Sequence, residues 1–436
     1  MKFTVTSVAK SGARIGCLTD FARSPSSTFE TPLLLLHTRG GSVPHLSHDL
    51  LQMVTAEKHV MQLPLVTLYE HIKNINAFGK GIADFASLGN YLFYATVQDS
   101  GSATPEGYHD KNSISLWSKG GRKLVDPQGY VQCMEALKPD LFQALSDGDS
   151  NLSSSMKRVK KSVDATIKFA STCALLKEQS EVLKHTPMLV SVTGGYNMRE
   201  RLRCIAGLQE VEAAGYVLDG FHTNGETAAN LNWEDIKPIL TETLDVLLKD
   251  KPRIFHGAFT PSILLEAVAH GVDVVDATFP WLIAERGGAL VFPNSILEDG
   301  QQVTETLPTV KKASHVESDK HDDKNAKEKE EIPMDRSYDI DLKNKLFFND
   351  FKPLLEGCSC YSCRKYSRSY VHHLLNTGEL LGPMLLMMHN LHHYLNFVGS
   401  IRTAIKEERL DTLKTKLVQF VESRKQHKNA DNVHES

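Results

Sequence analysis

Three cysteines near the C-terminal end of the chain could hold a metal ion. Cys358, Cys360 and Cys363 follow a C-x-C-x2-C spacing, and thiolates at this spacing can point at one centre from a tight turn. Three thiolates and one imidazole suit a closed, tetrahedral Zn²⁺ site. We therefore predict one structural zinc ion, and we favour it over a redox thiol cluster or an iron–sulfur site because no fourth cysteine lies nearby. The other cysteines are isolated and are expected to be buried thiols: Cys17, Cys133, Cys173 and Cys204.

The spacing of the cysteines does not fix a fourth ligand. At most one of the histidines that follow can complete the site, and a histidine on a helix is more often a core or surface group. His389 is attractive because Met387-Met388-His389 belongs to an apolar helical pattern that must pack inward. The candidates are His372, His373, His389, His392 and His393.

A carboxylate at the end of a predicted strand is the second chemical feature. Asp276 lies in the strand-like run Asp273–Thr278, and barrel enzymes place their chemistry at the C-terminal ends of strands. The alternative is a structural aspartate that caps the following turn. The residue type and position alone favour this structural interpretation.

The elements that would position these side chains alternate between strands and helices. Continuous apolar strands between amphipathic helices indicate a parallel sheet covered by helices. The number of units favours a (β/α)₈ barrel over a doubly wound sheet, and no GxGxxG follows an early strand. The region up to about residue 125 is predicted as strands and irregular connections. The main predicted strands are Leu33–Leu36, Tyr91–Val97, Leu141–Leu145, Met188–Thr193, Gly215–Gly220 and Arg253–Gly257, and the main predicted helices are Tyr130–Leu137, Ser154–Glu178, Asn197–Ala214, Thr227–Leu248, Pro261–His270, Met384–Ile405 and Lys406–Arg424.

Composition limits the possible classes of protein. The 436 residues include 41% hydrophobic residues and carry a net charge of −4, so we expect a globular chain whose contacts with nucleic acid are local. No apolar run approaches the ~18–20 residues of a membrane span. Lys311–Glu331 has 13 charged residues among 21 and is predicted to be a disordered insertion. We expect a barrel in residues 1–300, a charged insertion in 301–337, a zinc-binding subdomain in 338–400, a helix in 401–425 and a frayed tail in 426–436.

Several motifs resemble those of the tRNA-guanine transglycosylase family. That family has a C-x-C-x2-C motif with a histidine about 25 residues further on, and His389–Leu395 resembles its H-N-L-x-x-Y-L helix. Val192–Gly195 resembles its V-Q-G-G turn, and Gly215–Glu226 resembles G-Y-x-x-G-G…G-E. Thr38–His45 resembles the T-R-G-G-x-x-P-H segment of the eukaryotic accessory branch.

The resemblance implies an irregular α/β barrel, the (β/α)₈ or TIM fold, with an inserted C-terminal zinc-binding subdomain. It selects His389 as the fourth zinc ligand beside Cys358, Cys360 and Cys363, and it places Asp276 at the family's nucleophile position. The family exchanges guanine in tRNA for a modified base. In eukaryotes this base is queuine, which enters at wobble position 34 of tRNAs with GUN anticodons.

The chain departs from the family at other catalytic and base-reading positions. The D-S-G-G-F-Q segment, which supplies a second aspartate, is expected near 84–93, where only the out-of-register Asp84 is found. Ser146 and Thr193 replace a purine-reading Asp and Gln, and such losses weaken base discrimination by orders of magnitude. After Asp276 only the proline of C-V-L-P-T-R remains, although Arg286-Gly287-Gly288 partly restores a later R-x-G element.

We therefore expect a non-catalytic subunit of a heterodimer in which a catalytic partner performs the base exchange. No catalytic residue is then expected in this chain. The alternatives are an active transglycosylase that uses Asp276, and an unrelated barrel metalloenzyme. The expected partners are the catalytic subunit, a second copy in a homodimer, and tRNA. Candidates for contacts with tRNA are Arg364, Lys365 and Arg368, which could equally form an ordinary solvated turn.

The expected location of the chain is the cytoplasm. The N-terminal residues Met1–Thr6 lack the apolar segment of a secretion signal. The resemblance to the accessory branch also implies a peripheral position on the mitochondrial outer membrane.

Overall fold

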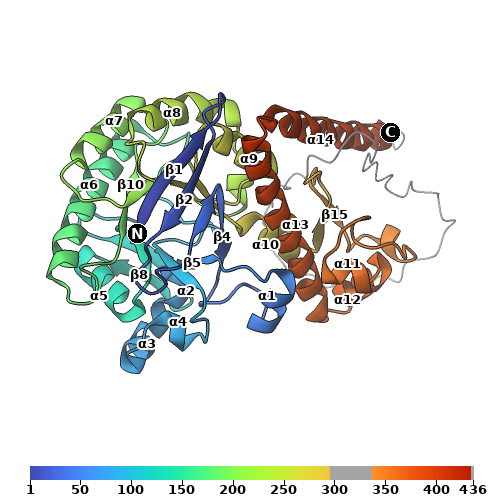
Figure 1. The fold of residues 1–436 in the computed structure, drawn as a ribbon, viewed down its shortest axis with the longest axis horizontal. Coiled ribbons are helices and arrows are strands. Elements are labelled where there is room, and N and C mark those ends of the chain that lie inside the picture. The colour runs from blue at the N-terminus through green and yellow to red at the C-terminus, as the bar shows by residue number, and fades with distance from the viewer. Residues whose placement is uncertain (295–335, 434–436) are drawn as a thin grey trace, which may run out of the picture.

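Eight parallel strands form a closed barrel in the computed structural model, which describes residues 1–294 and 336–433 (Figure 1). Neighbouring strands of the barrel are hydrogen-bonded in the order β10-β11-β12-β13-β4-β5-β6-β9. This confirms the predicted α/β barrel. The strands are β4 (Leu33–His37), β5 (Val60–Pro64), β6 (Leu92–Thr96), β9 (Leu141–Gln143), β10 (Met188–Val192), β11 (Gly215–Leu218), β12 (Arg253–Phe255) and β13 (Val274–Asp276).

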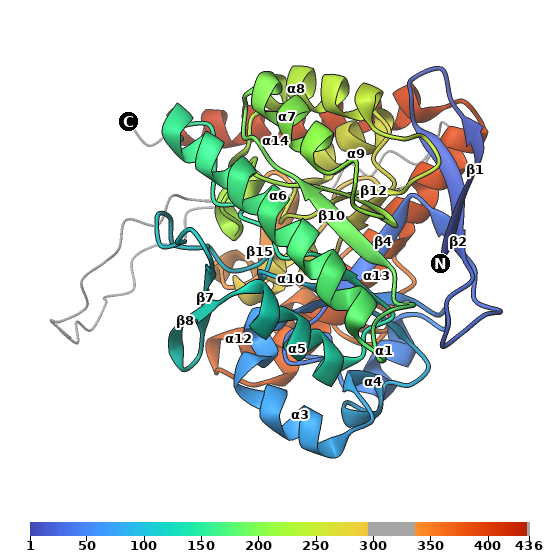
Figure 2. The same ribbon diagram turned by 90° about the vertical axis from the view of Figure 1, so that its left-hand side faces the viewer.

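Helices cover the outside of the barrel between successive strands, as Figure 2 shows for α6, α7 and α8. Their starts follow local capping chemistry. The side chains of Ser155, Asn197 and Thr260 each accept a hydrogen bond from the first turn of the helix that follows. The helices of this layer are α5 (Pro127–Leu137), α6 (Met156–Gln179), α7 (Met198–Gly207), α8 (Trp233–Val246), α9 (Pro261–Ala269) and α10 (Thr278–Glu285).

Two predicted helices are longer than those observed. The helix predicted to reach Ala214 ends at Gly207. The single helix predicted over Thr227–Leu248 is a short 3₁₀ helix, η2 (Glu226–Asn230), followed by α8. Asn232 separates η2 from α8 because its side chain caps the N-terminus of α8 by accepting a hydrogen bond from Glu234.

Alternate residues of the barrel strands face two different cores. Leu33 and Leu35 of β4 belong to the interior cluster, whereas Leu34 and Leu36 belong to the layer between strands and helices. An N-terminal antiparallel sheet of β1 (Lys2–Val8), β2 (Arg14–Thr19) and β3 (Phe29–Thr31) adds Phe3 to the interior cluster. The polar end of the barrel that remains for chemistry is therefore the C-terminal end of the strands.

The N-terminal region contains more regular structure than the sequence predicts. The predictions include no helix before residue 125, and β5 is not among the predicted strands. The structure nevertheless shows four α-helices there, each of seven residues or fewer, which is too short for a clear helical repeat. The region also contains α1 (His48–Val54), α2 (Leu65–Leu68), η1 (Tyr69–His71), α3 (Ile72–Phe78), α4 (Ile82–Phe85) and the hairpin β7 (Ile114–Ser118)–β8 (Gly121–Val125).

The C-terminal part packs beside the barrel as a small sheet and several helices (Figure 1). The long helix α13 contacts α1, α10 and β14. It crosses residue 400, where the sequence predicts a domain boundary, and α14 continues beyond residue 425, where it predicts a tail. The elements are β14 (Gly288–Leu290), β15 (Asp339–Asp341), η3 (Lys345–Phe347), α11 (Tyr361–Lys365), α12 (Arg368–Asn376), α13 (Leu381–Lys406) and α14 (Leu410–Val433).

Two further expectations concern these regions. The predicted charged insertion Lys311–Glu331 lies outside the described residues. Among the helices of the described part, none has the length and apolarity that a bilayer span requires.

Candidate metal centre and barrel mouth

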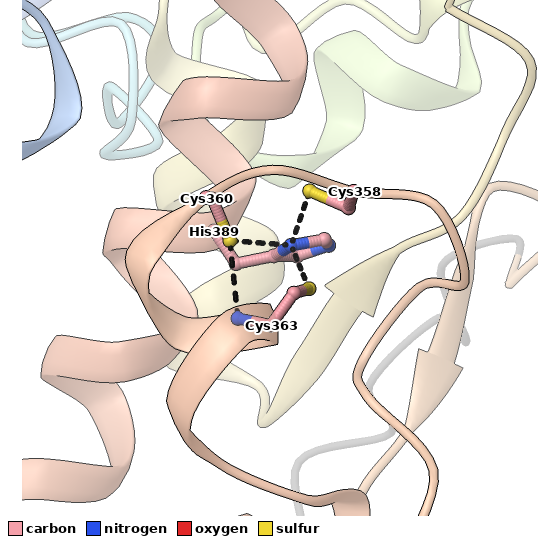
Figure 3. Close-up of side chains that lie close together, drawn as sticks. All are labelled: Cys358, Cys360, Cys363 and His389. Carbon is pink, nitrogen blue, oxygen red and sulfur yellow. Dashed lines mark hydrogen bonds between the residues drawn. The ribbon is translucent and has the colours of Figure 1, made fainter.

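The three clustered cysteines and His389 meet in space (Figure 3). The cysteines lie in the loop before α11 and in its first turn, while His389 comes from α13. The Nδ1 atom of His389 lies 3.8 Å from Cys358 Sγ, 3.5 Å from Cys360 Sγ and 3.3 Å from Cys363 Sγ. Within the described residues, no other group of three or more His, Cys, Asp or Glu side chains has its ligand atoms this close together.

These distances fit a tetrahedral zinc site. Zn–S bonds of about 2.3 Å and Zn–N bonds of about 2.0–2.1 Å place sulfur and nitrogen ligands about 3.6 Å apart. The Nε2 atom of His389 donates a hydrogen bond of 2.8 Å to the carbonyl oxygen of Leu290. That bond fixes the ring and its tautomer, so that Nδ1 faces the sulfurs with its lone pair. The donor set is therefore suitable for a metal ion.

The electrostatics of the cluster agree with this conclusion. Hydrogen bonds from Cys360 and Cys363 lower the pKa of Cys358 well below its usual range. Burial alone lowers the pKa of His389, but Cys358 and Cys360 outweigh burial and raise it to about 10. The cluster thus favours thiolate at Cys358, the form that binds a metal ion, whereas His389 has to release its Nδ1 proton before it can act as a ligand.

The remaining candidate histidines do not reach the sulfurs. His372 is buried and donates to the carbonyl oxygen of Leu342, and His393 donates to that of Phe292. His392 lies near the side chain of Ser359, with 3.4 Å between Nε2 and Oγ, and His373 is exposed. Only His389 therefore stands where the resemblance places a fourth ligand.

Asn390, the next residue of α13, holds this helix against β14. Its Oδ1 accepts a hydrogen bond of 2.9 Å from the amide of Leu290, and its Nδ2 donates one of 3.0 Å to the carbonyl of Gly288. Both bonds are buried. His389 is thus positioned by a helix that is hydrogen-bonded to the end of the barrel region.

Asp276 lies at the C-terminal end of β13 and is 2% exposed. Its Oδ1 accepts a hydrogen bond of 3.0 Å from the amide of Thr278, as a turn-capping aspartate would. Its Oδ2 accepts from the amide of Gly257 at 3.1 Å and from Gln62 Nε2 at 3.4 Å. The residue therefore combines the capping role with a position in the barrel mouth.

A second aspartate lies in the mouth, at a place that the sequence analysis missed. Asp84, the residue found near the expected segment, is exposed on α4 outside the barrel. The mouth instead contains Asp99, just beyond the end of β6 and 2% exposed. Asp99-Ser100-Gly101 preserves three residues of the D-S-G-G pattern. The signal was available, because this triplet directly follows the predicted strand Tyr91–Val97 and the intervening Gln98.

Polar side chains connect the two aspartates. The carboxylate of Asp99 lies 3.3 Å from Arg39 Nε and 3.5 Å from His37 Nε2. The amide of Gln62 donates to Ser100 Oγ at 3.0 Å and to Asp276 at 3.4 Å. The mouth therefore contains a second carboxylate at Asp99 and not at Asp84, and no glutamine follows Asp99-Ser100-Gly101-Ser102 closely.

The other half of the mouth contains a small polar cavity of about 50 Å³. Ser146 lines it and accompanies Asp219, with 3.4 Å between Ser146 Oγ and Asp219 Oδ2. Thr193 does not line it, because its hydroxyl lies 3.2 Å from that of Thr166, in the layer behind the strands. The lining residues also include Gln143, Asp149, His222, Thr223, Asn224 and His256.

Two of the three histidines that line this cavity, His222 and His256, favour the neutral form. Burial lowers the pKa of His222 and of His256, and it outweighs the opposing effect of the nearby aspartates. Neutral imidazoles offer one donor and one acceptor each. The cavity is therefore polar without being strongly cationic.

Comparison with known proteins identifies the family. The family model described as queuine tRNA-ribosyltransferase matches residues 9–423. The chain belongs to this family. Curated relatives named queuine tRNA-ribosyltransferase accessory subunit 2 include the Xenopus tropicalis protein, 39% identical over 95% of this chain and 98% of the relative. The Homo sapiens and Danio rerio proteins of the same name are 35% and 34% identical, with the same coverage.

Membership of the queuine tRNA-ribosyltransferase family excludes the unrelated barrel metalloenzyme. The family name also refers to tRNA, the ligand considered for the basic residues after the cysteines.

Arg364 and Lys365 are exposed, as an RNA contact requires. Arg368 is only 2% exposed and donates to Asp350 and to the carbonyl of Leu354 at 3.1 Å each. Arg368 is therefore a structural residue, and its predicted role on an RNA face is wrong.

Arg286 is also structural, as part of an ion cluster. It and Arg336 pair with the buried carboxylate of Asp339 on β15. The later R-x-G element thus joins α10 to the C-terminal sheet.

Proposed function

We propose that the chain is the non-catalytic subunit of a heterodimeric queuine tRNA-ribosyltransferase. The catalytic partner would exchange guanine for queuine at wobble position 34 of tRNAs with GUN anticodons. The names of the relatives, which describe an accessory subunit, support this role. An accessory subunit implies a catalytic partner chain and tRNA as substrate, and this chain would contribute assembly and RNA surface.

The closed barrel mouth is the observation that carries the proposal. Asp99 and Asp276 are each 2% exposed, and the adjoining cavity of about 50 Å³ is far below the ~300–1,000 Å³ of most ligand pockets. A base and the C1′ of its ribose would have to reach a carboxylate nucleophile and a second carboxylate acting as acid or base. Ser146 and Thr193, which stand at the purine-reading positions, cannot supply a carboxylate or an amide.

An active transglycosylase with Asp276 as nucleophile is the second candidate. The observation in its favour is that Gln62 and Ser100 link Asp276 to the segment that carries Asp99. Two strand-end carboxylates in one mouth are the minimum that the family's chemistry requires. We rank this candidate second because neither carboxylate reaches open space.

Base exchange by purified protein distinguishes the two candidates. We expect no incorporation of labelled guanine or queuine into tRNA by this chain alone, and incorporation when the catalytic subunit is added. Turnover by the chain alone would overturn the proposal. A covalent tRNA adduct that is trapped with the unaltered chain and lost in Asp276→Asn would establish the second candidate.

We further propose that Cys358, Cys360, Cys363 and His389 hold one structural Zn²⁺. Four protein ligands leave no open coordination position for substrate. The ion would fix the loop before α11 to α13, and its task would be assembly. The predicted limits, with a zinc-binding subdomain in 338–400, remain a proposal in which α13 is shared between the subdomain and the barrel.

The surface of this subdomain is the proposed docking site for the catalytic partner. The three most exposed large apolar side chains among the described residues are Leu380, Phe351 and Phe348, with 79%, 76% and 66% exposure. Tyr366 and Tyr370 lie between Phe351 and Leu380 in the sequence. Their rings stack on each other, with centroids 5.6 Å apart. Exposed aromatic and apolar groups of this kind mark protein interfaces. A homodimer through the same surface is the alternative assembly.

We also propose that the heterodimer works in the cytoplasm. The accessory branch implies a peripheral position on the mitochondrial outer membrane, and this remains part of the proposal. Arg364 and Lys365 are the proposed contacts with tRNA phosphates.

A further inference from the structure

Trp281 of α10 covers one half of the barrel mouth. It is 5% exposed, and its ring stacks on that of His37, with centroids 5.0 Å apart and an angle of 22° between the planes. His37 ends β4 and contacts Asp99 through Nε2 and Thr278 through Nδ1. The indole therefore lies directly against the layer of side chains that contains the strand-end carboxylates.

Backbone in the segment that follows β6 makes room for this indole. A Cβ placed on Gly101 would lie 2.1 Å from Cζ3 of Trp281, closer than any side chain tolerates. Gly101 follows Asp99 by two residues. The close approach means that no base could lie between Trp281 and this segment without displacement of the indole.

Two side chains of the Thr38–His45 segment hold Trp281 in place. The guanidinium carbon of Arg39 lies 5.0 Å from the centroid of the Trp281 ring, and its Nε is 3.3 Å from Asp99. His45 donates to Glu285 Oε1 at 2.6 Å, and the same oxygen accepts a hydrogen bond of 2.8 Å from Trp281 Nε1. The face and the edge of the indole are thus both restrained.

The backbone of the segment presents these two side chains. The amide of Arg39 donates to the carbonyl of Ser42 at 2.9 Å, which closes a turn with Gly40 and Gly41 at positive φ of 66° and 92°. This turn places Arg39 over the Trp281 ring and His45 beside Glu285, which accepts the hydrogen bond of the indole. Arg39 contacts Asp99 and Trp281, and His45 contacts Glu285.

We propose that Trp281, held by Arg39 and by the His45–Glu285 pair, is a fixed cap that keeps a nucleobase away from Asp99 and Asp276. An indole and a purine are both fused five- and six-membered rings, so the indole fills space of the size that a base needs. Trp281 is then the residue that determines exclusion of base from this barrel. The inference rests on the proposed non-catalytic function and supplies its physical cause.

Fluorescence quenching tests the cap without any measurement of activity. The chain has three tryptophans, so Trp117→Phe and Trp233→Phe leave Trp281 as the sole reporter. We expect weak quenching by acrylamide in this protein and an increase of at least threefold in the quenching constant after Arg39→Ala. Arg122→Ala is the matched control, because Arg122 stacks on Tyr108 instead. Strong quenching before Arg39 is changed, or no increase afterwards, would overturn the proposal.

Equilibrium dialysis with tritiated guanine, and with indole as a competitor, tests what the cap excludes. We expect no guanine binding to the unaltered chain, and binding to Trp281→Ala that indole displaces. Trp281→Leu serves if the alanine variant does not fold, as judged by its thermal transition. Indole binding without guanine binding would overturn the inference. Base exchange by the unaltered chain would overturn the proposed function instead, so the two failures are distinguishable.

Discussion

The two ring nitrogens of His389 have different partners, and this difference defines the metal centre. Nε2 donates to the carbonyl of Leu290 at 2.8 Å, while Nδ1 faces three sulfurs at 3.3–3.8 Å. A neutral imidazole has one donor and one acceptor nitrogen. The protein therefore selects the tautomer that can ligate zinc, and it does so with a backbone group of β14.

Replacing His389 by alanine should remove the metal and destabilise the subdomain. The change leaves three thiolates without a fourth ligand and also breaks the bond to Leu290. Because structural zinc supplies about 10 kcal/mol or more to small zinc domains, we expect at least several kcal/mol of lost unfolding free energy. Metal content by mass spectrometry and unfolding in guanidinium measure the two effects.

His392→Ala is the matched control for this change. His392 lies on the same helix, and its Nε2 contacts Asn396 at 3.0 Å and Ser359 at 3.4 Å, without a sulfur partner. We expect full zinc content and a loss within about 1 kcal/mol. Equal metal loss in both variants would contradict the assignment of His389.

Side chains of α13 form hydrogen bonds with the backbone of β14 and the residues after it, as a neighbouring strand would. His389, Asn390 and His393 bond to the backbone of residues 288–292, and Tyr394 donates to the carbonyl of Phe259 at 3.1 Å. The sheet β14–β15 has only two strands, so these bonds satisfy buried backbone groups that would be costly unpaired. The H-N-L-x-x-Y-L pattern thus mainly docks α13 against the backbone of residues 288–292, and it includes His389, the proposed metal ligand.

Elements that begin and end at local capping residues could be predicted from the sequence. Thr260 and Pro261 start α9 and Gly271 follows its end, as predicted, because capping is a local interaction. The strand β5 (Val60–Pro64) could not, because closure of the barrel rather than local pattern makes it a strand. The cluster of Cys358, Cys360, Cys363 and His389 could be predicted from spacing and resemblance. The stacking of Trp281 on His37 could not, because it depends on tertiary packing between residues 244 positions apart in the sequence.

His59, immediately before β5, should make stability depend on pH. Its pKa is lowered from 6.5 to about 4, chiefly by burial; Glu57 opposes this shift and Arg402 of α13 contributes to it. A depressed histidine pKa means that the unfolded chain binds more protons between pH 4 and 6.5. The unfolding free energy should therefore fall by roughly 2–3 kcal/mol from this residue as the pH drops from about 7 to 4.

His59→Gln should flatten this dependence, because glutamine does not titrate and can still bond to Thr55. The Nε2 atom of His59 lies 3.0 Å from Thr55 Oγ1. Urea unfolding at several pH values measures the slope. His48→Gln, a change on α1 at a half-exposed position, should leave the slope as it is. An unchanged slope in His59→Gln would contradict the assignment.

At the scale of the whole molecule, a net positive charge and exposed apolar side chains occur together in the part beside the barrel. Residues 343–380 contain six Lys or Arg and three Asp or Glu, in a chain with a net charge of −4. The helices α11 and α12 lie on one side of the barrel in Figure 1, away from α6. A surface that is positive, aromatic and apolar in an otherwise acidic chain suits contact with a partner more than isolation in water.

Charges placed on this surface should separate the proposed subunits without unfolding either one. Phe351 and Leu380 are 76% and 79% exposed, so the double change Phe351→Glu and Leu380→Glu buries no charge in the free chain. At an interface it would desolvate two carboxylates, and we expect at least a tenfold, or about 1.4 kcal/mol, loss of affinity for the catalytic subunit. Calorimetric titration measures that affinity, while zinc content and the thermal midpoint should not change. Leu175→Glu on α6, at a position 65% exposed, is the control and should bind normally. Normal binding by the double variant would exclude these two side chains from the interface. Weaker binding by both the double variant and the Leu175→Glu control would indicate nonspecific repulsion by the added charge.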